Sequence, residues 1–173
     1  MCCTLLIGGH ETTANQINLS LLLLLDHPGQ VARLRADPGL MPAAVEELLR
    51  CTRLGGLAPA RVTREDVQIG EVTIRAGEQV IPLYATANRD PSVFTDPDRL
   101  DVTRDAAGHL SFGAGVHHCL GAQLARVELQ EAFRGLIGRL PGLRLAVPAA
   151  DLEFKPGKAI HSLRELPVLW GEP

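Results

Sequence analysis

A single cysteine, Cys119, stands where a glycine-rich segment runs into a predicted helix. Residues 112–121 read FGAGVHHCLG, and apolar residues recur near helical spacing from Leu120 to Leu140. Cys119 is therefore expected near the positive end of a helix dipole, where backbone N–H groups that lack intrahelical partners can point at its sulfur. Both effects favour the thiolate, which is the form that binds metals and attacks electrophiles.

The chemistry of this segment has three possible interpretations. Its glycines permit positive φ angles and the close approach of a flat, bulky group, which suits a thiolate that ligates haem iron and favours O–O cleavage. A cysteine hydrolase would use His117 or His118 to activate Cys119, but no hydrolase signature surrounds the cysteine. A zinc site built from Cys119, His109 and the two adjacent histidines is weaker still, because no second paired half is present.

A second polar pattern interrupts a predicted helix over residues 4–25, where residues 8–13 read GGHETT. Each glycine inside a helix costs about 1 kcal/mol relative to alanine. A threonine hydroxyl can bond to an upstream carbonyl, so local widening of the helix is expected. A carboxylate beside a hydroxyl can pass protons from water. Taken alone, the simpler interpretation is a polar interruption that caps or kinks a core helix.

A third pattern is an acid–base pair, Glu47 and Arg50, on a predicted helix that has Pro42 in its first turn and runs to about Thr52. Such pairs are usually solvated and contribute about 0.3–0.5 kcal/mol. By itself, the pair indicates no chemistry.

Together, these patterns resemble the cytochrome P450 family. Phe112, Gly115, Cys119 and Gly121 fit its haem-binding signature, F-x-x-G-x-x-x-C-x-G. The resemblance implies that Cys119 is the axial ligand of the iron of haem b. It also implies a set of residues that contact the haem: Phe112, Gly113, Gly115, His117, Cys119, Gly121, Arg61, Gly8 and Gly9.

The GGHETT stretch matches the family pattern (A or G)-G-x-(D or E)-T-(T or S), which lies on the helix that crosses the open face of the haem. The resemblance implies that Gly8 and Gly9 make room for O₂. It assigns the catalytic role to Glu11 and Thr12, which would deliver protons to the oxygen-binding side.

Two further residues match the family's partners for the haem propionates. They are Arg61, which opens a predicted strand, and His117. An arginine can grip a carboxylate in bidentate fashion, and a histidine can donate to one. Arg126 has two open interpretations: a solvent-exposed charge, or a cation that helps to dock an acidic electron donor.

In this family the E-x-x-R pair, here Glu47 and Arg50, is completed by an arginine from an irregular segment, and the three lock the cysteine loop in place. The sequence PDRL matches that segment, so Arg99 is the predicted third member and Arg104 is its competitor. The family more often has an aromatic residue at the position of Leu100.

The resemblance implies a mainly α fold with small β-sheets (α+β), of which residues 1–173 form the C-terminal two-fifths or so. The N-terminal part is absent by this comparison. The chain is therefore expected to be a truncated gene product, or one piece completed by a complementing N-terminal chain. Within it, Leu57 and Ala58 are expected in the wall of a substrate pocket.

Periodicity and turn signals outline the elements. Helices are predicted over residues 4–25, 30–36 and 42–52 and from residue 120 onward, with short strands over 60–62, 67–69, 72–74 and 79–83. Residues 90–108 are predicted to form an irregular segment over the surface of the core, and strand-like pieces follow residue 143.

The implied function is that of a haem-dependent monooxygenase. Such an enzyme inserts one oxygen atom from O₂ into a small organic substrate, with electrons from NAD(P)H through a ferredoxin/reductase-type donor. The alternative is a catalytically inactive remnant, either haem-binding or inert.

Composition and charge limit the partners and the cellular compartment that are expected. A net charge of −3 without charge runs argues against a nucleic-acid or anionic-membrane partner. Polar residues interrupt the apolar stretch over residues 2–25, so a buried helix is predicted rather than a membrane span. The four cysteines show no disulfide framework, which suits a reducing cytoplasm. Arginine far outnumbers lysine, which is consistent with a bacterial source.

Overall fold

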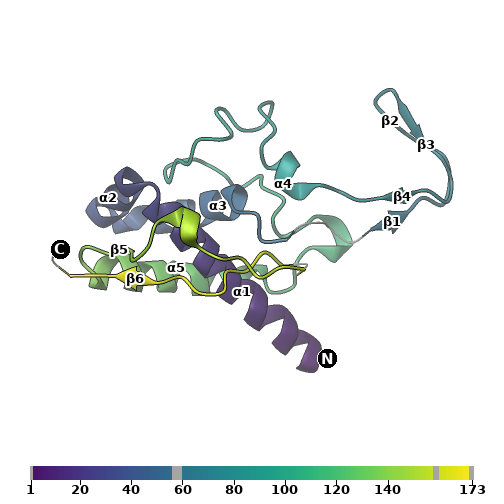
Figure 1. Ribbon diagram of the computed structural model, residues 1–173. Helices are drawn as coiled ribbons and strands as arrows, with labels where there is room; N and C mark the ends of the chain where they lie inside the picture. The colour runs from purple at the N-terminus through teal and green to yellow at the C-terminus, as the bar shows by residue number, and fades with distance from the viewer. Residues whose placement is uncertain (1, 56–59, 158–159, 172–173) are drawn as a thin grey trace.

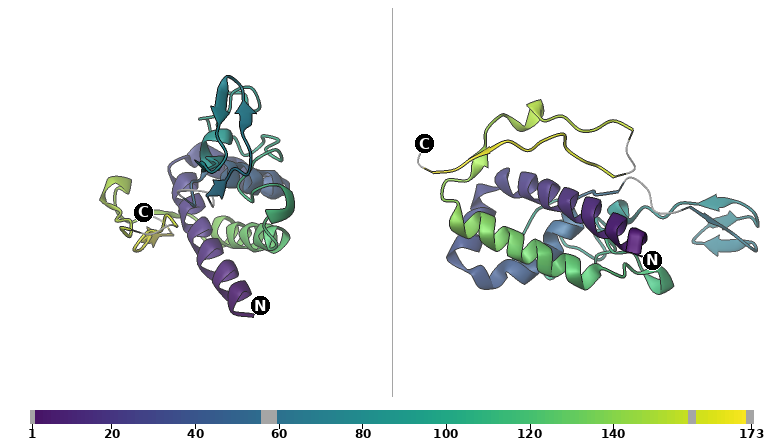
Figure 2. Two further views of the ribbon diagram at one scale, coloured as in Figure 1. Left: turned by 90° about the vertical axis from the view of Figure 1, so that its right-hand side faces the viewer. Right: turned by 90° about the horizontal axis from the view of Figure 1, so that it is seen from below.

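Four helices form the body of the molecule. The computed structural model describes residues 2–55, 60–157 and 160–171. The two long helices, α1 (Cys2–Leu25) and α5 (Ala122–Arg139), lie against each other, and α2 (Pro28–Ala36) and α3 (Met41–Cys51) pack on them (Figures 1 and 2). The three N-terminal helices predicted from periodicity are confirmed, with ends that differ by one or two residues. In the described residues, no helix has the length and apolar character that a membrane span requires.

Local chemistry explains where these helices begin and end. Pro28 occupies the first turn of α2, where a missing N–H costs nothing. Asp37 ends α2 and accepts from the Gly39 N–H at 2.9 Å, which starts a short 3₁₀ turn, η1 (Pro38–Leu40). At the end of α3, the Thr52 hydroxyl donates to the Leu48 carbonyl at 2.7 Å.

The core lies between the inner faces of α1, α3 and α5. Leu24 from α1, Val45 from α3 and Phe133 from α5 are fully buried. The irregular segment also contributes Leu100 and Val102 to this cluster. The segment was predicted to lie over the core; in the structure it is part of it, because its apolar side chains are buried although its backbone is irregular.

In the described part of the chain, six short strands form separate antiparallel pairs. They are β1 (Arg61–Val62) with β4 (Gln79–Val80), β2 (Val67–Ile69) with β3 (Val72–Ile74), and β5 (Arg144–Leu145) with β6 (Val168–Leu169). β4 is shorter than predicted because the chain turns at Leu83 into a one-turn helix, α4 (Tyr84–Ala87). Two further 3₁₀ turns are η2 (Gly115–His117) and η3 (Ala149–Asp151).

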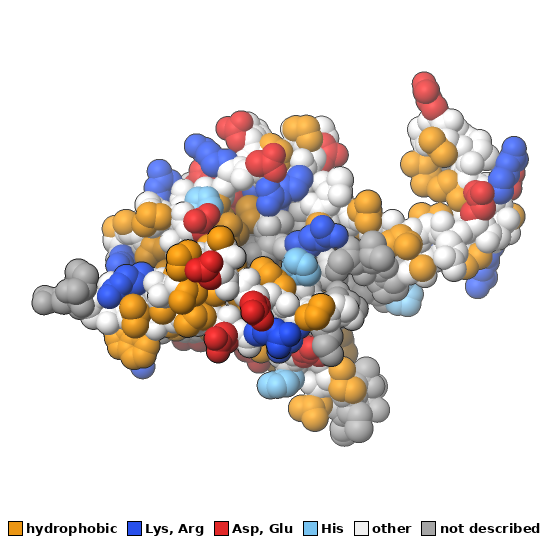
Figure 3. Space-filling model, viewed as in Figure 1, with side chains coloured by type: hydrophobic (Ala, Val, Ile, Leu, Met, Phe, Trp, Pro, Cys, Tyr) orange, Lys and Arg blue, Asp and Glu red, His pale blue; other side chains and the backbone are white. Residues whose placement is uncertain are grey.

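The strands β1 to β4 form an arm that projects from the helical body (Figure 1). Apolar side chains lie on its surface (Figure 3). Four large apolar side chains of the arm are exposed: Val62, Val67, Ile69 and Val72. The rest of the chain therefore leaves much of the apolar surface of the arm exposed to solvent.

The packing of α5 gives a direct test of the core. Leu129 is 1 % exposed and Leu124 is 61 % exposed on the same helix. We expect Leu129→Ala to lower the free energy of unfolding by about 2–5 kcal/mol, because it leaves a cavity. The matched Leu124→Ala should cost well under about 1 kcal/mol. Urea unfolding followed by circular dichroism measures both, and equal losses would contradict this packing.

Candidate haem-thiolate site

The cysteine loop is a set of tight turns in front of α5. The Cys119 N–H donates to the Phe112 carbonyl at 2.9 Å, which closes the loop on itself. Gly113 and Gly115 have φ angles of +72° and +73°, so the predicted need for glycine is confirmed at these two positions. Helix α5 begins at Ala122, slightly later than predicted, with Gly121 as its N-cap.

The surface around Cys119 is open and apolar. The thiol is exposed, and its neighbours Val116 and Leu120 are 96 % and 85 % exposed. A Cβ added at Gly115 or Gly121 would meet no atom within 4 Å. One exposed thiol beside a bare apolar surface is a donor set that fits a flat, apolar group with a single soft axial ligand, as haem requires.

The GGHETT stretch lies on the N-terminal half of α1, at the same end of the molecule as the start of α5 (Figure 2). A Cβ added at Gly8 or Gly9 would also meet open space. The Thr12 hydroxyl donates to the Gly8 carbonyl, as the sequence predicted. The predicted widening is wrong, because α1 stays α-helical throughout. Glu11 is exposed and, with Leu6, Ile7 and His10, lines a shallow depression.

A buried ion cluster lies beneath the cysteine loop. Arg50 Nε donates to Glu47 Oε2 at 2.7 Å, and both side chains are fully buried. The third member is Arg104, whose Nε donates to Glu47 Oε1 at 3.0 Å. The prediction of Arg99 is wrong: its side chain is 66 % exposed and pairs with Asp101. The PDRL sequence matched the family segment, but the chain turns so that the competitor, Arg104, points back to Glu47 on α3.

Arg50 is fully satisfied in its buried position. Its guanidinium has five N–H donors. They reach both Glu47 oxygens, the carbonyls of Asn88 and Pro97, and the sulfur of Cys51. Burial alone would raise the pKa of Glu47, but the hydrogen bonds from Arg50, the Asp101 N–H and Arg104 lower it below its ordinary value. The carboxylate therefore stays ionised and fixes α3 to the irregular segment.

Asn88 and Ser111 join the loop to this cluster. Asn88 Oδ1 accepts from the Leu110 N–H at 2.7 Å, and its Nδ2 donates to Ser111 Oγ at 2.9 Å. Ser111 Oγ donates in turn to the Leu49 carbonyl at 2.7 Å. Neither residue was predicted from the sequence, because asparagine and serine are also ordinary turn residues.

Glu46 is a second, partly buried acid that was not predicted from the sequence. Its carboxylate accepts from Arg126 Nε at 2.6 Å and lies 3.1 Å from His109 Nε2. Burial opposes ionisation, but these two partners outweigh it and lower the pKa of Glu46 from 4.5 to about 2. Arg126 is therefore an anchored side chain rather than a freely solvated charge. In the sequence, Glu46 is visible only as a second acid next to Glu47, and its spacing from Arg126 and His109 indicates no contact.

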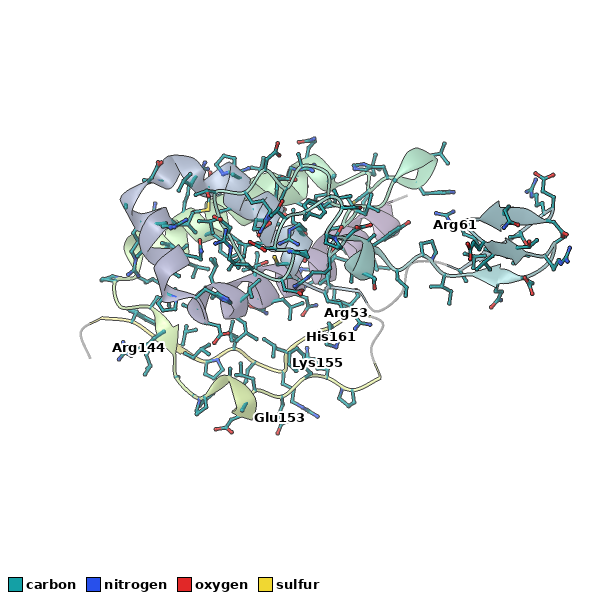
Figure 4. All side chains as sticks on the ribbon, turned by 90° about the horizontal axis from the view of Figure 1, so that it is seen from above. Arg53, Arg61, Arg144, Glu153, Lys155 and His161 are labelled. Carbon is teal, nitrogen blue, oxygen red and sulfur yellow. The ribbon has the colours of Figure 1, made fainter. Side chains whose placement is uncertain are left out.

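The two predicted propionate partners are exposed. Arg61 lies on β1, where the arm leaves the body (Figure 4), and His117 lies in η2 of the cysteine loop. Both side chains are thus accessible to a ligand. Leu57 and Ala58 lie outside the described residues.

The two alternative interpretations gain no support. Within the described residues, no three His, Cys, Asp or Glu side chains gather in a metal-binding group. Across the same part of the chain, no hydrogen bond joins the Cys119 thiol to His117 or His118. A larger depression, of about 530 Å³, lies beside the C-terminal half of α5, where it contains none of the predicted site residues.

Comparison with known proteins decides the family. The family described as Cytochrome P450 matches residues 39–139, which is more than half of the chain. The chain belongs to the cytochrome P450 family. This membership implies haem as the cofactor.

Curated P450 relatives have about 50 % sequence identity to this chain over the aligned residues. Cytochrome P450 105A3 of Streptomyces carbophilus is 54 % identical over 166 residues, which are 96 % of this chain and 40 % of that protein. Nocardicin C N-oxygenase of Nocardia uniformis is 55 % identical over 168 residues, 96 % of this chain and 42 % of its own length. The chain therefore spans about 40 % of the length of the P450 relatives it matches.

Solved P450 structures confirm the fold of this part. The LnmA cytochrome P450 hydroxylase of Streptomyces atroolivaceus has a TM-score of 0.92 and 52 % identity, over 96 % of this chain and 43 % of that one. P450BioI in complex with an acyl carrier protein has a TM-score of 0.92 and 48 % identity, over 99 % of this chain and 44 % of that one. The mainly helical fold with small sheets is thus part of the P450 fold.

The correction from Arg99 to Arg104 is testable. We expect Arg104→Gln to lower the free energy of unfolding by about 3 kcal/mol, because it leaves the buried Glu47 carboxylate with one partner fewer. Arg99→Gln removes an exposed pair and should cost less than about 1 kcal/mol. Urea unfolding of the two matched variants measures the difference. A larger loss for Arg99→Gln would restore the original assignment.

The lowered pKa of Glu46 predicts a pH dependence. Because the folded state holds the proton more weakly than the unfolded state, the ionised carboxylate stabilises the fold above about pH 4.5, and this contribution disappears as the pH falls toward 2. Glu46→Gln should therefore cost about 3 kcal/mol at pH 7, with a deficit that shrinks in acid. Unfolding titrations from pH 7 to 2 test this, with the exposed Glu131→Gln as control. A deficit that does not change with pH would contradict it.

Proposed function

We propose that this chain is the C-terminal, haem-thiolate part of a bacterial P450 monooxygenase, with Cys119 as the axial ligand of haem b. The observation that carries the proposal is the loop that closes on Phe112 and presents an exposed Cys119 thiol beside open, apolar surface. Membership of the family and the names of its relatives, which include a hydroxylase and an N-oxygenase, support it.

The residues of the loop divide the work of holding the haem. Cys119 would provide the thiolate, and the turns at Gly113 and Gly115, with φ angles that favour glycine, would let the backbone approach the haem. Phe112 and Gly121 set the two ends of the loop. His117 would donate to one propionate, and Arg61 would bind a propionate as a cation. When bound, haem supplies the activation of O₂ that no side chain can provide.

The N-terminal half of α1 would serve the opposite face of the haem. Gly8 and Gly9 leave room for O₂, because neither residue has a Cβ and the space that a Cβ would fill is open. Glu11 is exposed and can take up protons from water, and Thr12 lies on the following position of the same helix. We assign proton delivery to Glu11 and Thr12. Overall, a C–H bond, O₂, two electrons and two protons would give an alcohol and water.

The proposed setting is the bacterial cytoplasm, with a small organic substrate and electrons from NAD(P)H through a ferredoxin/reductase-type donor. The remaining length of the P450 relatives would come from a complementing N-terminal chain or a longer form of this protein. In P450BioI the solved complex contains an acyl carrier protein, so carrier-bound substrates are one option in this family.

A second candidate function is an inactive remnant, either haem-binding or inert. The apolar arm and the exposed Leu6 and Ile7 on α1 favour it, because a haem site enclosed on few sides exposes apolar surface.

Haem reconstitution tests Cys119 as the ligand and separates the proposal from an inert remnant. We expect the purified chain, supplied with haem, reduced and exposed to carbon monoxide, to show the red-shifted Soret band of a thiolate complex. Cys119→Ser should lose that band, and Cys51→Ser, which alters a half-buried thiol, should keep it. A band that survives Cys119→Ser would remove Cys119 as ligand. Failure of the unaltered chain to take up haem would favour the inert remnant.

A further inference from the structure

We propose that Arg126 is a positioning residue that holds a fixed positive charge under the cysteine loop, next to the Cys119 thiolate. The inference deepens the proposed function and rests on it for its consequence in the haem-loaded protein. The charge itself is a property of this chain and can be tested without haem.

The Arg126 side chain is held by Glu46, which lies on α3. Its Nε and Nη2 donate to the two oxygens of Glu46 at 2.6 Å and 3.0 Å, in a bidentate pair. The two side chains are only 22 % and 17 % exposed, so solvent screens this pair less than a surface pair. A bidentate arginine has little freedom to rotate, because both ends of its planar fork are held.

The Arg126 guanidinium also contacts the cysteine loop. Its Cζ lies 4.7 Å from the centroid of the Phe112 ring, which is a cation–π contact. The Phe112 carbonyl accepts the Cys119 N–H at 2.9 Å. Helix α3 thus reaches the ligand residue through Glu46, Arg126 and Phe112 in turn.

The Glu46 carboxylate has a second partner besides Arg126. The same carboxylate lies 3.1 Å from His109 Nε2, and the His109 side chain is almost fully buried. The hydrogen bonds that Arg126 donates to Glu46 raise the pKa of Arg126, and an ionised Cys119 raises it further. The contact with the Phe112 ring places the cation of this pair on the side of the cysteine loop.

A cation in this place would have one chemical consequence. It draws electron density from the thiolate and so lessens what the sulfur donates to a bound metal. In the haem-loaded protein, loss of Arg126 should lower the midpoint potential of the iron. Arg126 would act through Cys119, without touching substrate or iron.

The test uses two alkylating reagents on the haem-free chain. Iodoacetate carries a negative charge and iodoacetamide does not, but both attack the same thiolate. The ratio of their rates at Cys119 therefore reports the local potential and cancels the fraction of thiolate. Peptide mass spectrometry separates Cys119 from Cys2, Cys3 and Cys51.

We expect Arg126→Gln to lower the iodoacetate-to-iodoacetamide ratio about threefold or more at low salt. Arg126→Lys should keep most of the ratio, because it keeps the charge. Arg134→Gln makes the same change of charge further along α5, where the arginine pairs with Glu131, and should leave the ratio unchanged. Circular dichroism confirms that each variant remains folded.

An unchanged ratio in folded Arg126→Gln would overturn the inference, and so would equal losses in Arg126→Gln and Arg126→Lys, which indicate packing alone. Haem uptake is measured separately. A chain that binds no haem contradicts the proposed function, whereas the alkylation ratio still decides the role of Arg126. In a haem-loaded chain, a midpoint potential that does not fall in Arg126→Gln would contradict the consequence drawn for the iron.

Discussion

The buried pairing of Glu47 with Arg50 and Arg104 is the constraint on which the rest of the structure depends. The Glu47 and Arg50 side chains are both fully buried. The free-energy cost of taking two charges out of water is offset only if their donors and lone pairs have hydrogen-bond partners. Arg50 achieves this by bonding to carbonyls of an irregular segment as well as to Glu47. The segment therefore has a defined path without regular secondary structure, because its backbone oxygens serve the buried guanidinium.

The cysteine loop depends on that path. Asn88 and Ser111 connect the loop to α3, and Glu46 with Arg126 supports the Phe112 ring. These contacts lie beneath the loop, whereas Cys119 and Val116 face open space. The loop is thus held by hydrogen bonds on its inner side and exposed on its outer side. That is the arrangement expected of a ligand-bearing turn, which must be held by the protein and remain available to the group it binds.

The exposed apolar surfaces have a common physical meaning. The arm formed by β1 to β4 and the N-terminal half of α1 both carry large apolar side chains in solvent (Figure 3). The helical core beneath them is well packed, so these surfaces are not a sign of poor folding. They match a chain that covers about 40 % of its relatives, in which further protein and haem would bury the same side chains.

The sequence by itself determined the helices, the short strands and the cysteine loop. Periodicity, prolines and glycines act over a few residues, so they can be interpreted without the fold. Only the tertiary structure decided which side chains support the loop. Arg104 replaces Arg99 because the irregular segment turns before it reaches Glu47, and Glu46, Asn88 and His109 acquire partners on distant segments. Hydrogen bonds between such segments depend on distances in space, and residue spacing along the chain does not contain them.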